Sequence, residues 1–193
     1  ALCSLQWDLP ESQWEAPIDI EMGNNRKVMP SAITLLPDGR AFIGDKAFDP
    51  EILKQANAYV CFKQKPVEMD GERERLMIRF MSEVYKLIRE NTSGILNDSN
   101  HVVFIATPSG WDATSQDIYK QMAKAAGIPI YGVTKESRAA YIRGMHSPAS
   151  GLSQNVRKGA IVFDMGSSTL DFTYLSDSFS RPVDFGHDRG ASH

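Results

Sequence analysis

The sequence predicts an α/β fold, and three observations lead to this prediction. From residue 101 onward, short apolar runs alternate with longer periodic segments, as strands and helices do in α/β proteins. Hydrophobic residues make up 42% of the 193 residues and charged residues 23%, the profile of a soluble globular protein. We find no internal repeat and no low-complexity tract, so one domain or two small lobes are expected.

Charge and composition exclude several functional classes. The net charge of −3 gives no basic field that would attract nucleic acid or an anionic membrane. No apolar run approaches the ~18–20 residues that span a bilayer, and the first residues lack the layout of a signal peptide. Two cysteines are too few for a disulfide framework, and the four histidines show no metal-ligand spacing. We expect a cytoplasmic protein and, because the chain does not begin with Met, a piece of a longer one.

The first half predicts a hairpin and two helices. A strong turn signal at 37–39 separates the strands 32–36 and 40–44. A helix should begin after Asp49, which is a favoured N-cap and is followed by proline. Residues 71–91 form the clearest helix. Its apolar stripe consists of Met77, Phe80, Met81, Val84, Leu87 and Ile88.

A strand and a capped helix follow. Residues 101–108 predict a buried strand that a proline stops. Residues 113–128 predict a helix, with Thr114 and Asp117 as a capping box and Gly127 as its end.

The remaining segments continue the alternation. Residues 128–134 predict a strand and residues 136–145 a helix. Residues 146–159 carry three serines, two glycines and a proline, which favours a linker. A hairpin then follows, and 181–186 predict one more strand.

The hairpin begins with an apolar run that ends in an acid. Ile161, Val162 and Phe163 are typical of a fully buried strand. Asp164 follows at the carboxyl end, where open α/β sheets place ligands.

The turn that follows suits a phosphate group. Gly166 allows the backbone to approach a ligand closely, and Ser167, Ser168 and Thr169 offer hydroxyls and backbone N–H groups. Asp171 lies two residues beyond Thr169, so both can point to one face. A β-turn whose side chains cap their own backbone would have the same composition, and this alternative stays open.

Three segments resemble one family. "FDMGSSTLD" meets the pattern Asp-x-Gly-x-x-Thr-x-Asp, which is similar to the second phosphate-binding motif of the actin-like ATPases. Residues 102–145 resemble the strand-Pro, helix, Ala-Gly-Ile, strand, Glu-x-x-Ala-Ala series of the 70-kDa heat-shock chaperones. Residues 28–48 resemble their Pro-Ser-strand-turn-strand segment. The chain therefore looks like a divergent member of that family over essentially its whole length.

The resemblance implies a ribonuclease-H-like, actin-like ATPase lobe, in which helices flank a mixed sheet. Residues 1–146 would form the first lobe without its first phosphate loop, which should precede Ala1. Residues 147–158 would be a linker, and 159–193 the opening hairpin of a second lobe.

The resemblance also implies that the strand carrying the first phosphate loop lies in the middle of the sheet, so that without it the place beside 102–106 is vacant. Strand 160–164 would fill the vacant place beside 102–106, either within the chain or by exchange between chains in an oligomer.

The resemblance also implies the site residues. Lys63, with Lys65 as the alternative, lies where the chaperones carry the lysine that contacts the terminal phosphate. Glu136 matches the glutamate that helps to order the attacking water. Asp164 and Asp171 would hold Mg²⁺ through water, and Asp171 is expected to be catalytic. The phosphates of ATP or ADP would contact Asp164, Gly166, Ser167, Ser168 and Thr169.

The sequence departs from the family at several of these places. The phosphate turn reads Gly-Ser-Ser from Gly166 where the family has Gly-Gly-Gly, and Glu136 is followed by Ser137 instead of proline. Near the position of Gln116 the family carries an arginine that couples nucleotide to the next domain, and neither Gln116 nor Asp117 supplies that charge here.

The function that the resemblance implies is ATP hydrolysis in a chaperone whose cycle opens and closes a cleft, although the fragment alone should be inactive. Co-chaperones and unfolded peptide would be partners of the intact protein. A small-molecule kinase of the same superfamily and an actin-like filament or scaffold protein are the alternatives.

Overall fold

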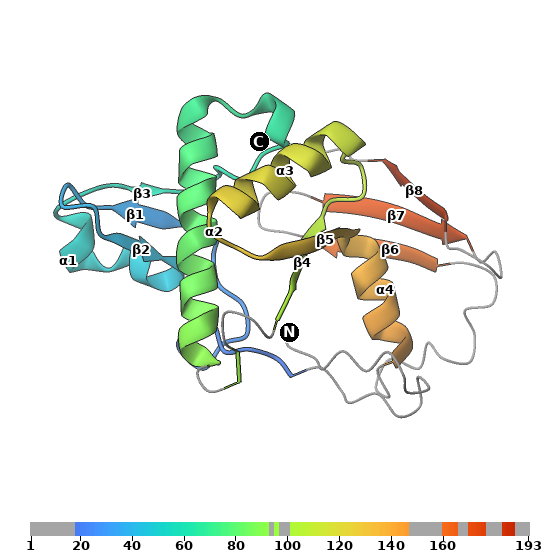
Figure 1. Ribbon diagram of the computed structural model, residues 1–193, viewed down its shortest axis with the longest axis horizontal. Helices are drawn as coiled ribbons and strands as arrows, with labels where there is room; N and C mark the ends of the chain where they lie inside the picture. Colours follow the sequence, from blue (N-terminus) through green and yellow to red (C-terminus); the bar gives the residue numbers. More distant parts are fainter. Residues whose placement is uncertain are drawn as a thin grey trace. The chain divides into compact units, whose positions relative to one another are not determined.

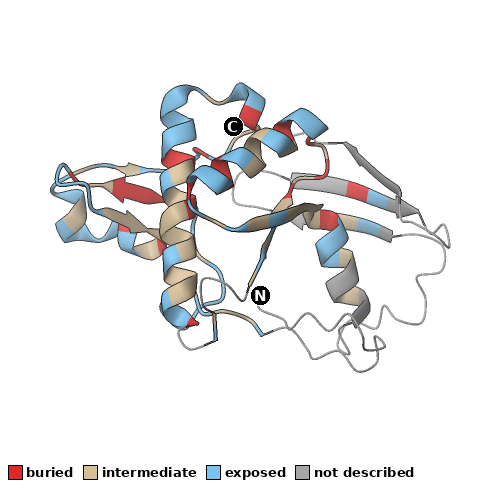
Figure 2. Ribbon diagram, in the orientation of Figure 1, coloured by how far each residue is buried: buried red, intermediate tan, exposed pale blue. Residues whose placement is uncertain are grey.

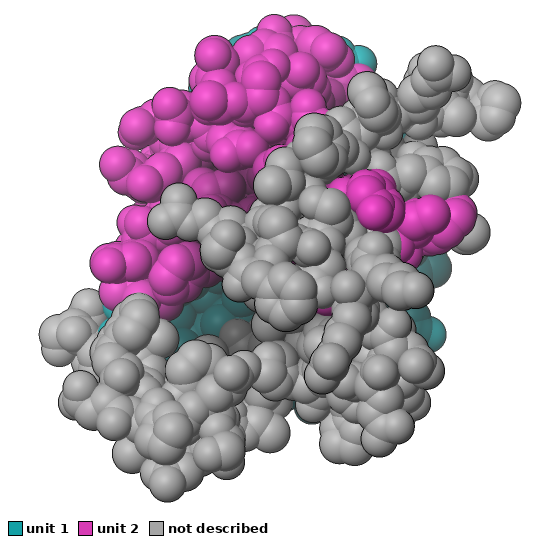
Figure 3. Space-filling view, turned by 90° about the vertical axis from the view of Figure 1, so that its right-hand side faces the viewer, with its two compact units in different colours: residues 1–63, 71–101 teal, residues 64–70, 102–193 magenta. Residues whose placement is uncertain are grey.

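The computed structural model describes residues 18–92, 95–96, 101–146, 160–165, 170–176 and 183–187 (Figure 1). The chain divides into two compact units, which Figure 3 colours separately. The first unit contains residues 1–63 and 71–101, and the second contains residues 64–70 and 102–193. The expected lobes 1–146 and 159–193, with their linker, stay a prediction.

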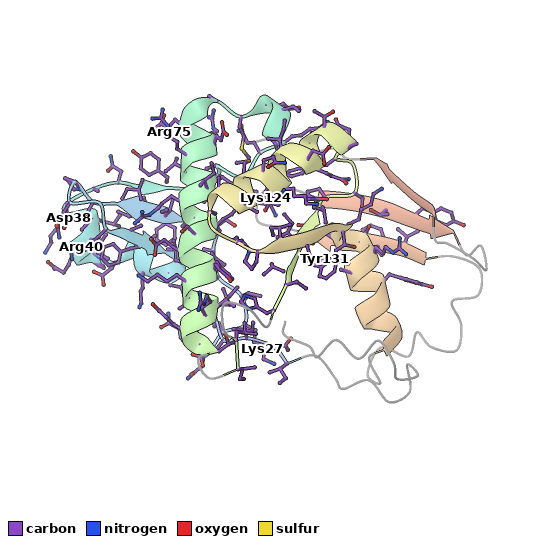
Figure 4. The ribbon with its side chains drawn as sticks, in the orientation of Figure 1. Lys27, Asp38, Arg40, Arg75, Lys124 and Tyr131 are labelled. Carbon is purple, nitrogen blue, oxygen red and sulfur yellow. The ribbon has the colours of Figure 1, made fainter. Side chains whose placement is uncertain are left out.

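An antiparallel sheet opens the first unit. It consists of β1 (Ile33–Leu35), β2 (Ala41–Ile43) and β3 (Ala58–Tyr59), in the order β2-β1-β3. The predicted turn joins β1 to β2, and Gly39 takes the left-handed φ of +87° that such a turn requires. Beside it, the Nε of Arg40 lies 2.7 Å from Oδ2 of Asp38 (Figure 4). The turn chemistry read from the sequence is confirmed.

Two short helical segments connect β2 to β3. The first is a 3₁₀ helix (Gly44–Phe48), and the second is α1 (Pro50–Leu53). Asp49 caps α1 as predicted, because its side chain accepts a hydrogen bond of 2.8 Å from the Glu51 N–H.

The long helix α2 spans Gly71–Asn91, which confirms the predicted bounds. Met77 and Met81 of the predicted stripe are buried, and Leu76, which the stripe did not include, is buried as well (Figure 2). The ring of Phe62 meets that of Phe80 edge-on, with centroids 5.3 Å apart. Other buried apolar residues of this unit are Ala32, Ile33, Leu36 and Ala47.

A parallel pair of strands forms the centre of the second unit. The strands β4 (Val103–Thr107) and β5 (Ile130–Lys135) are joined through α3 (Ala113–Ala125). Gly127 ends α3 as predicted, with a φ of +81°. The Gly127 and Ile128 N–H groups return to carbonyls of the last turn, at 2.9 and 3.1 Å. The helix α4 (Glu136–His146) follows β5 without a loop.

The expected burial of the first parallel strand is only partly met. Phe104 in β4 is 51% exposed, and its ring contacts that of Tyr131 with centroids 5.3 Å apart (Figure 4). A Cβ on Gly132 would lie 2.9 Å from Cε1 of Phe104, so this ring covers the glycine instead of entering a core.

A second antiparallel sheet contains β6 (Ala160–Met165), β7 (Leu170–Ser176) and β8 (Val183–His187), in that order. Among the described strands, β6 pairs with β7, and β4 with β5 forms a separate sheet. The expected pairing of 160–164 with 102–106 within the chain is therefore wrong. Only four residues separate β6 from β7 in the sequence, so their pairing costs little loop entropy, whereas insertion beside β4 would close a much longer loop. Exchange between chains stays a prediction.

The expected burial of β6 is also wrong. Ile161 is 62% exposed and Phe163 is 63% exposed, and both lie on the same face of the strand. The apolar residues 161–163 predicted a strand buried on both faces, but the face of β6 that carries Ile161 and Phe163 is exposed to solvent.

The observed architecture is mixed α/β, as the alternation predicted, and the ribonuclease-H-like arrangement stays a prediction. None of the helices in the described ranges has the length and apolar character needed to cross a bilayer.

Candidate functional site

Glu136 lies at the carboxyl edge of the parallel strands. Thr107 and Lys135 are the last paired residues of β4 and β5. Because parallel neighbours end at the same edge of a sheet, the chain leaves both strands there, which is where α/β proteins place ligands. Glu136 is the first residue of α4 and is half-buried. The carboxylate that is predicted to order the attacking water therefore lies at this edge, and its role stays a prediction.

The start of α3 lies beyond the same strand, and Asp112 organises it. Its Oδ1 accepts a hydrogen bond of 2.8 Å from the Ser115 N–H, and its Oδ2 lies 2.9 Å from Nζ of Lys65. The Ser115 N–H and then the Lys65 ammonium lower the pKa of Asp112 to about 2. The predicted capping box of Thr114 and Asp117 is wrong, because Asp112 is the N-cap.

The two lysine candidates differ in their surroundings. Lys65 belongs to the second unit, where its ammonium pairs with Asp112. Lys63 is exposed and belongs to the first unit, directly after the buried Phe62. Because Lys63 and Glu136 are in different units, their meeting at one phosphate stays a prediction.

Three buried hydroxyls also lie at the carboxyl edge. Ser109, after β4, and Ser137, in the first turn of α4, are both buried and hydrogen-bond to each other. Thr107 is fully buried, and its hydroxyl donates to the Thr134 carbonyl at 3.4 Å. These three hydroxyls are therefore shielded from water, whereas Glu136 beside them is only half-buried.

Asp164 and Asp171 occupy directly opposed positions in the β6–β7 hairpin. One more pair, Met165 with Leu170, separates them from the predicted phosphate turn. The residues of that turn lie outside the described part of the chain: Gly166, Ser167, Ser168 and Thr169. Opposed residues of an antiparallel pair share a face, and like charges in such positions repel. A cation between them would relieve this repulsion.

The donor set fits Mg²⁺ better than a cation held by protein groups alone. In the described ranges, no group of three or more His, Cys, Asp or Glu residues could hold a metal ion. Mg²⁺ usually keeps several waters and uses one or two carboxylates plus substrate phosphates. Asp164 and Asp171, on either side of the predicted phosphate turn, therefore stay the predicted Mg²⁺ ligands.

Gln116 has a local role. Its Nε2 donates a hydrogen bond of 3.0 Å to the carbonyl of Trp111, just before α3. Trp111 is buried, and its ring meets that of Tyr119 edge-on at 5.2 Å. Gln116, near the position where the chaperones carry their coupling arginine, therefore helps to hold the start of α3.

Sequence reasoning missed two features of this region. The cap at Asp112 had a local signal, since an aspartate stands three residues before the N–H that it accepts from. The Ser109–Ser137 bond had no such signal, because the two residues come from segments that only the parallel pairing brings together.

Curated proteins of similar sequence are chaperones. The chain is 23% identical to proteins named "Chaperone protein HscA homolog" from Polynucleobacter asymbioticus, Cupriavidus metallidurans and Polynucleobacter necessarius. The matches cover 78%, 79% and 78% of this chain and 27% of each relative, so the chain spans about a quarter of their length. No family model matches. The chain is therefore distantly similar to chaperones of the 70-kDa heat-shock type.

Proposed function

We propose that this chain is part of the nucleotide-binding region of a chaperone-related ATPase. The observation that carries the proposal is the opposed placement of Asp164 and Asp171 on either side of the predicted phosphate turn. The distant similarity to chaperones across more than three quarters of the chain supports it. The position of Glu136 at the carboxyl edge of the parallel strands is the third observation that supports the proposal.

Each residue has a distinct task in this proposal. Glu136 accepts a hydrogen bond from the attacking water and so orients it. Lys63 stabilises negative charge on the terminal phosphate. Asp164 and Asp171 would hold Mg²⁺ through water, and a bound ion would neutralise charge on the phosphates. Thr169 and its neighbours in the turn donate hydrogen bonds to phosphate oxygens.

The intact protein would use ATP and Mg²⁺ to open and close a cleft between two lobes. Its partners would then be unfolded peptide and co-chaperones. These partners rest on the similarity to chaperones alone.

The test is ATP turnover by the intact protein and its variants. We expect Asp171→Asn and Glu136→Gln to lower hydrolysis by ~10²–10³-fold while ATP affinity changes much less. Asp184→Asn is the matched control, because Asp184 lies in β8 of the same sheet, away from the phosphate turn, and should leave turnover unchanged.

The lysines provide a second comparison. Lys63→Ala should lower turnover, whereas Lys65→Ala should act on stability through Asp112. Full turnover in the Asp171 and Glu136 variants would end the assignment. Loss of turnover in Lys65→Ala with none in Lys63→Ala would move the phosphate contact to Lys65.

A further inference from the structure

Two buried serines join the chain segments that leave the parallel strands. Ser109 lies just beyond β4 and Ser137 is the second residue of α4, and one hydroxyl donates a hydrogen bond to the other. Ser109 is 7% exposed and Ser137 is 3% exposed, so water hardly competes for either hydroxyl. Removing one hydroxyl would leave the other buried without this partner, and each serine therefore depends on the other.

A second side-chain link, within the paired part of β4 and β5, lies at a different place. The Thr107 hydroxyl donates to the Thr134 carbonyl at 3.4 Å, a long bond within the paired part of the sheet. The Ser109–Ser137 bond lies beyond the last pair, where hydrogen bonds of the strand ladder no longer hold the two segments.

The bond bears directly on Glu136. Glu136 is the first residue of α4 and follows β5 without a loop, so its direction depends on where the strand ends and the helix begins. Ser137 is the next residue, and Ser109 holds it at that point. The first turn of a helix has no intrahelical partners for its N–H groups and frays easily unless side chains fix it.

We propose that Ser109 and Ser137 are a positioning pair, which fixes the first turn of α4 and thereby the direction of the Glu136 carboxylate. The proposal rests on the proposed function for the role of Glu136 in ATP hydrolysis. In this proposal both serines act through Glu136 and not by binding the nucleotide. A displacement of about 1 Å in a positioned group can cost ~10²-fold in rate.

The test uses the intact protein with Ser109→Ala, Ser137→Ala and the double variant. We expect each single variant to slow single-turnover hydrolysis by about 10-fold or more, with ATP affinity within about twofold of wild type. The double variant should be no slower than either single one, because both changes break the same bond. Ser137→Thr keeps the hydroxyl and should restore most of the rate.

Ser115→Ala is the matched control. Ser115 is also fully buried in the first turn of a helix, α3, but it is not part of the pair. Its hydrolysis rate should stay within about twofold of wild type. Unchanged hydrolysis in Ser109→Ala and Ser137→Ala would overturn the proposal, even if both variants unfold more easily.

A second readout separates this inference from the proposed function. The ¹³C resonance of the Glu136 carboxylate should move in both single variants and stay in place in Ser115→Ala. If wild type does not hydrolyse ATP, the proposed function fails, and this resonance alone decides whether the pair positions Glu136. A resonance that stays in place would refute the pair's role. If a single variant does not fold, the double variant, which leaves neither hydroxyl unpaired, carries the same test.

Discussion

Truncation of Phe62 tests the packing of the buried residue that directly precedes Lys63, the candidate phosphate-binding lysine. Phe62 is 2% exposed, and its ring meets that of Phe80 edge-on at 5.3 Å. Phe62→Ala removes the buried ring and leaves a cavity, which typically costs ~3–5 kcal/mol. The edge-to-face contact accounts for ~0.5–1.5 kcal/mol of that loss. Against a total stability of ~5–15 kcal/mol for a typical domain, this change is severe.

A double-mutant cycle isolates the contact between the two rings. Phe80 on α2 is only half-buried, so Phe80→Ala should cost less than Phe62→Ala. The free energies of unfolding would be measured by urea denaturation, together with hydrogen exchange of α2. We expect a coupling of ~0.5–1.5 kcal/mol between the two changes. A loss below about 1 kcal/mol for Phe62→Ala would refute the reasoning, because a buried ring in a close-packed site cannot be removed so easily.

Three further predictions concern Asp112, Cys61 and the nucleotide. The pKa of Asp112 falls from 3.8 to about 2 on folding, so its contribution to stability is complete above pH 3.8 and is lost as the pH falls toward 2. In Asp112→Asn, the free energy of unfolding should therefore fall less steeply as the pH drops below 3.8. An unchanged pH dependence would contradict this role of Asp112. Cys61 has a left-handed φ of +57°, so the β-branched variant Cys61→Val should cost ~1–2 kcal/mol in urea denaturation, whereas Cys61→Gly should not. The 193-residue chain spans about a quarter of the length of its chaperone relatives, so by itself it should bind ATP weakly or not at all, because the loss of two or three contacts of ~1.5–3 kcal/mol each would lower affinity by several powers of ten. Micromolar binding in calorimetry would show that the nucleotide site has been mislocated.

Features that depend on neighbours in sequence were predictable. The α2 helix, the cap at Asp49, the turn at 37–39 and the end of α3 at Gly127 all follow from side chains within a few residues of one another. The sequence also predicted the hairpin, and the structure adds that Asp164 and Asp171 are directly opposed in it. The candidate site residues stay a prediction, and the contacts around Asp112, Ser109 and Ser137 could not be read from the sequence.

The cap of α3 shows how a local reading can fail. Thr114 and Asp117 had the spacing of a capping box, yet Asp112 is the cap. Both readings are compatible with helix-start preferences. The Lys65 ammonium lies against Asp112 from a distant part of the chain and so adds an interaction that the local pattern does not contain.

The sequence by itself determined the helices, the turns and the alternation that makes this an α/β chain, because hydrophobic periodicity and capping act over three or four residues. Only the tertiary structure decided the partner of β6, the exposure of Ile161 and Phe163, and the contact between Ser109 and Ser137. An apolar residue carries no information about which surface will cover it. Strand partners and buried hydrogen bonds depend on which segments meet in space, and distant segments meet only when the whole chain has folded.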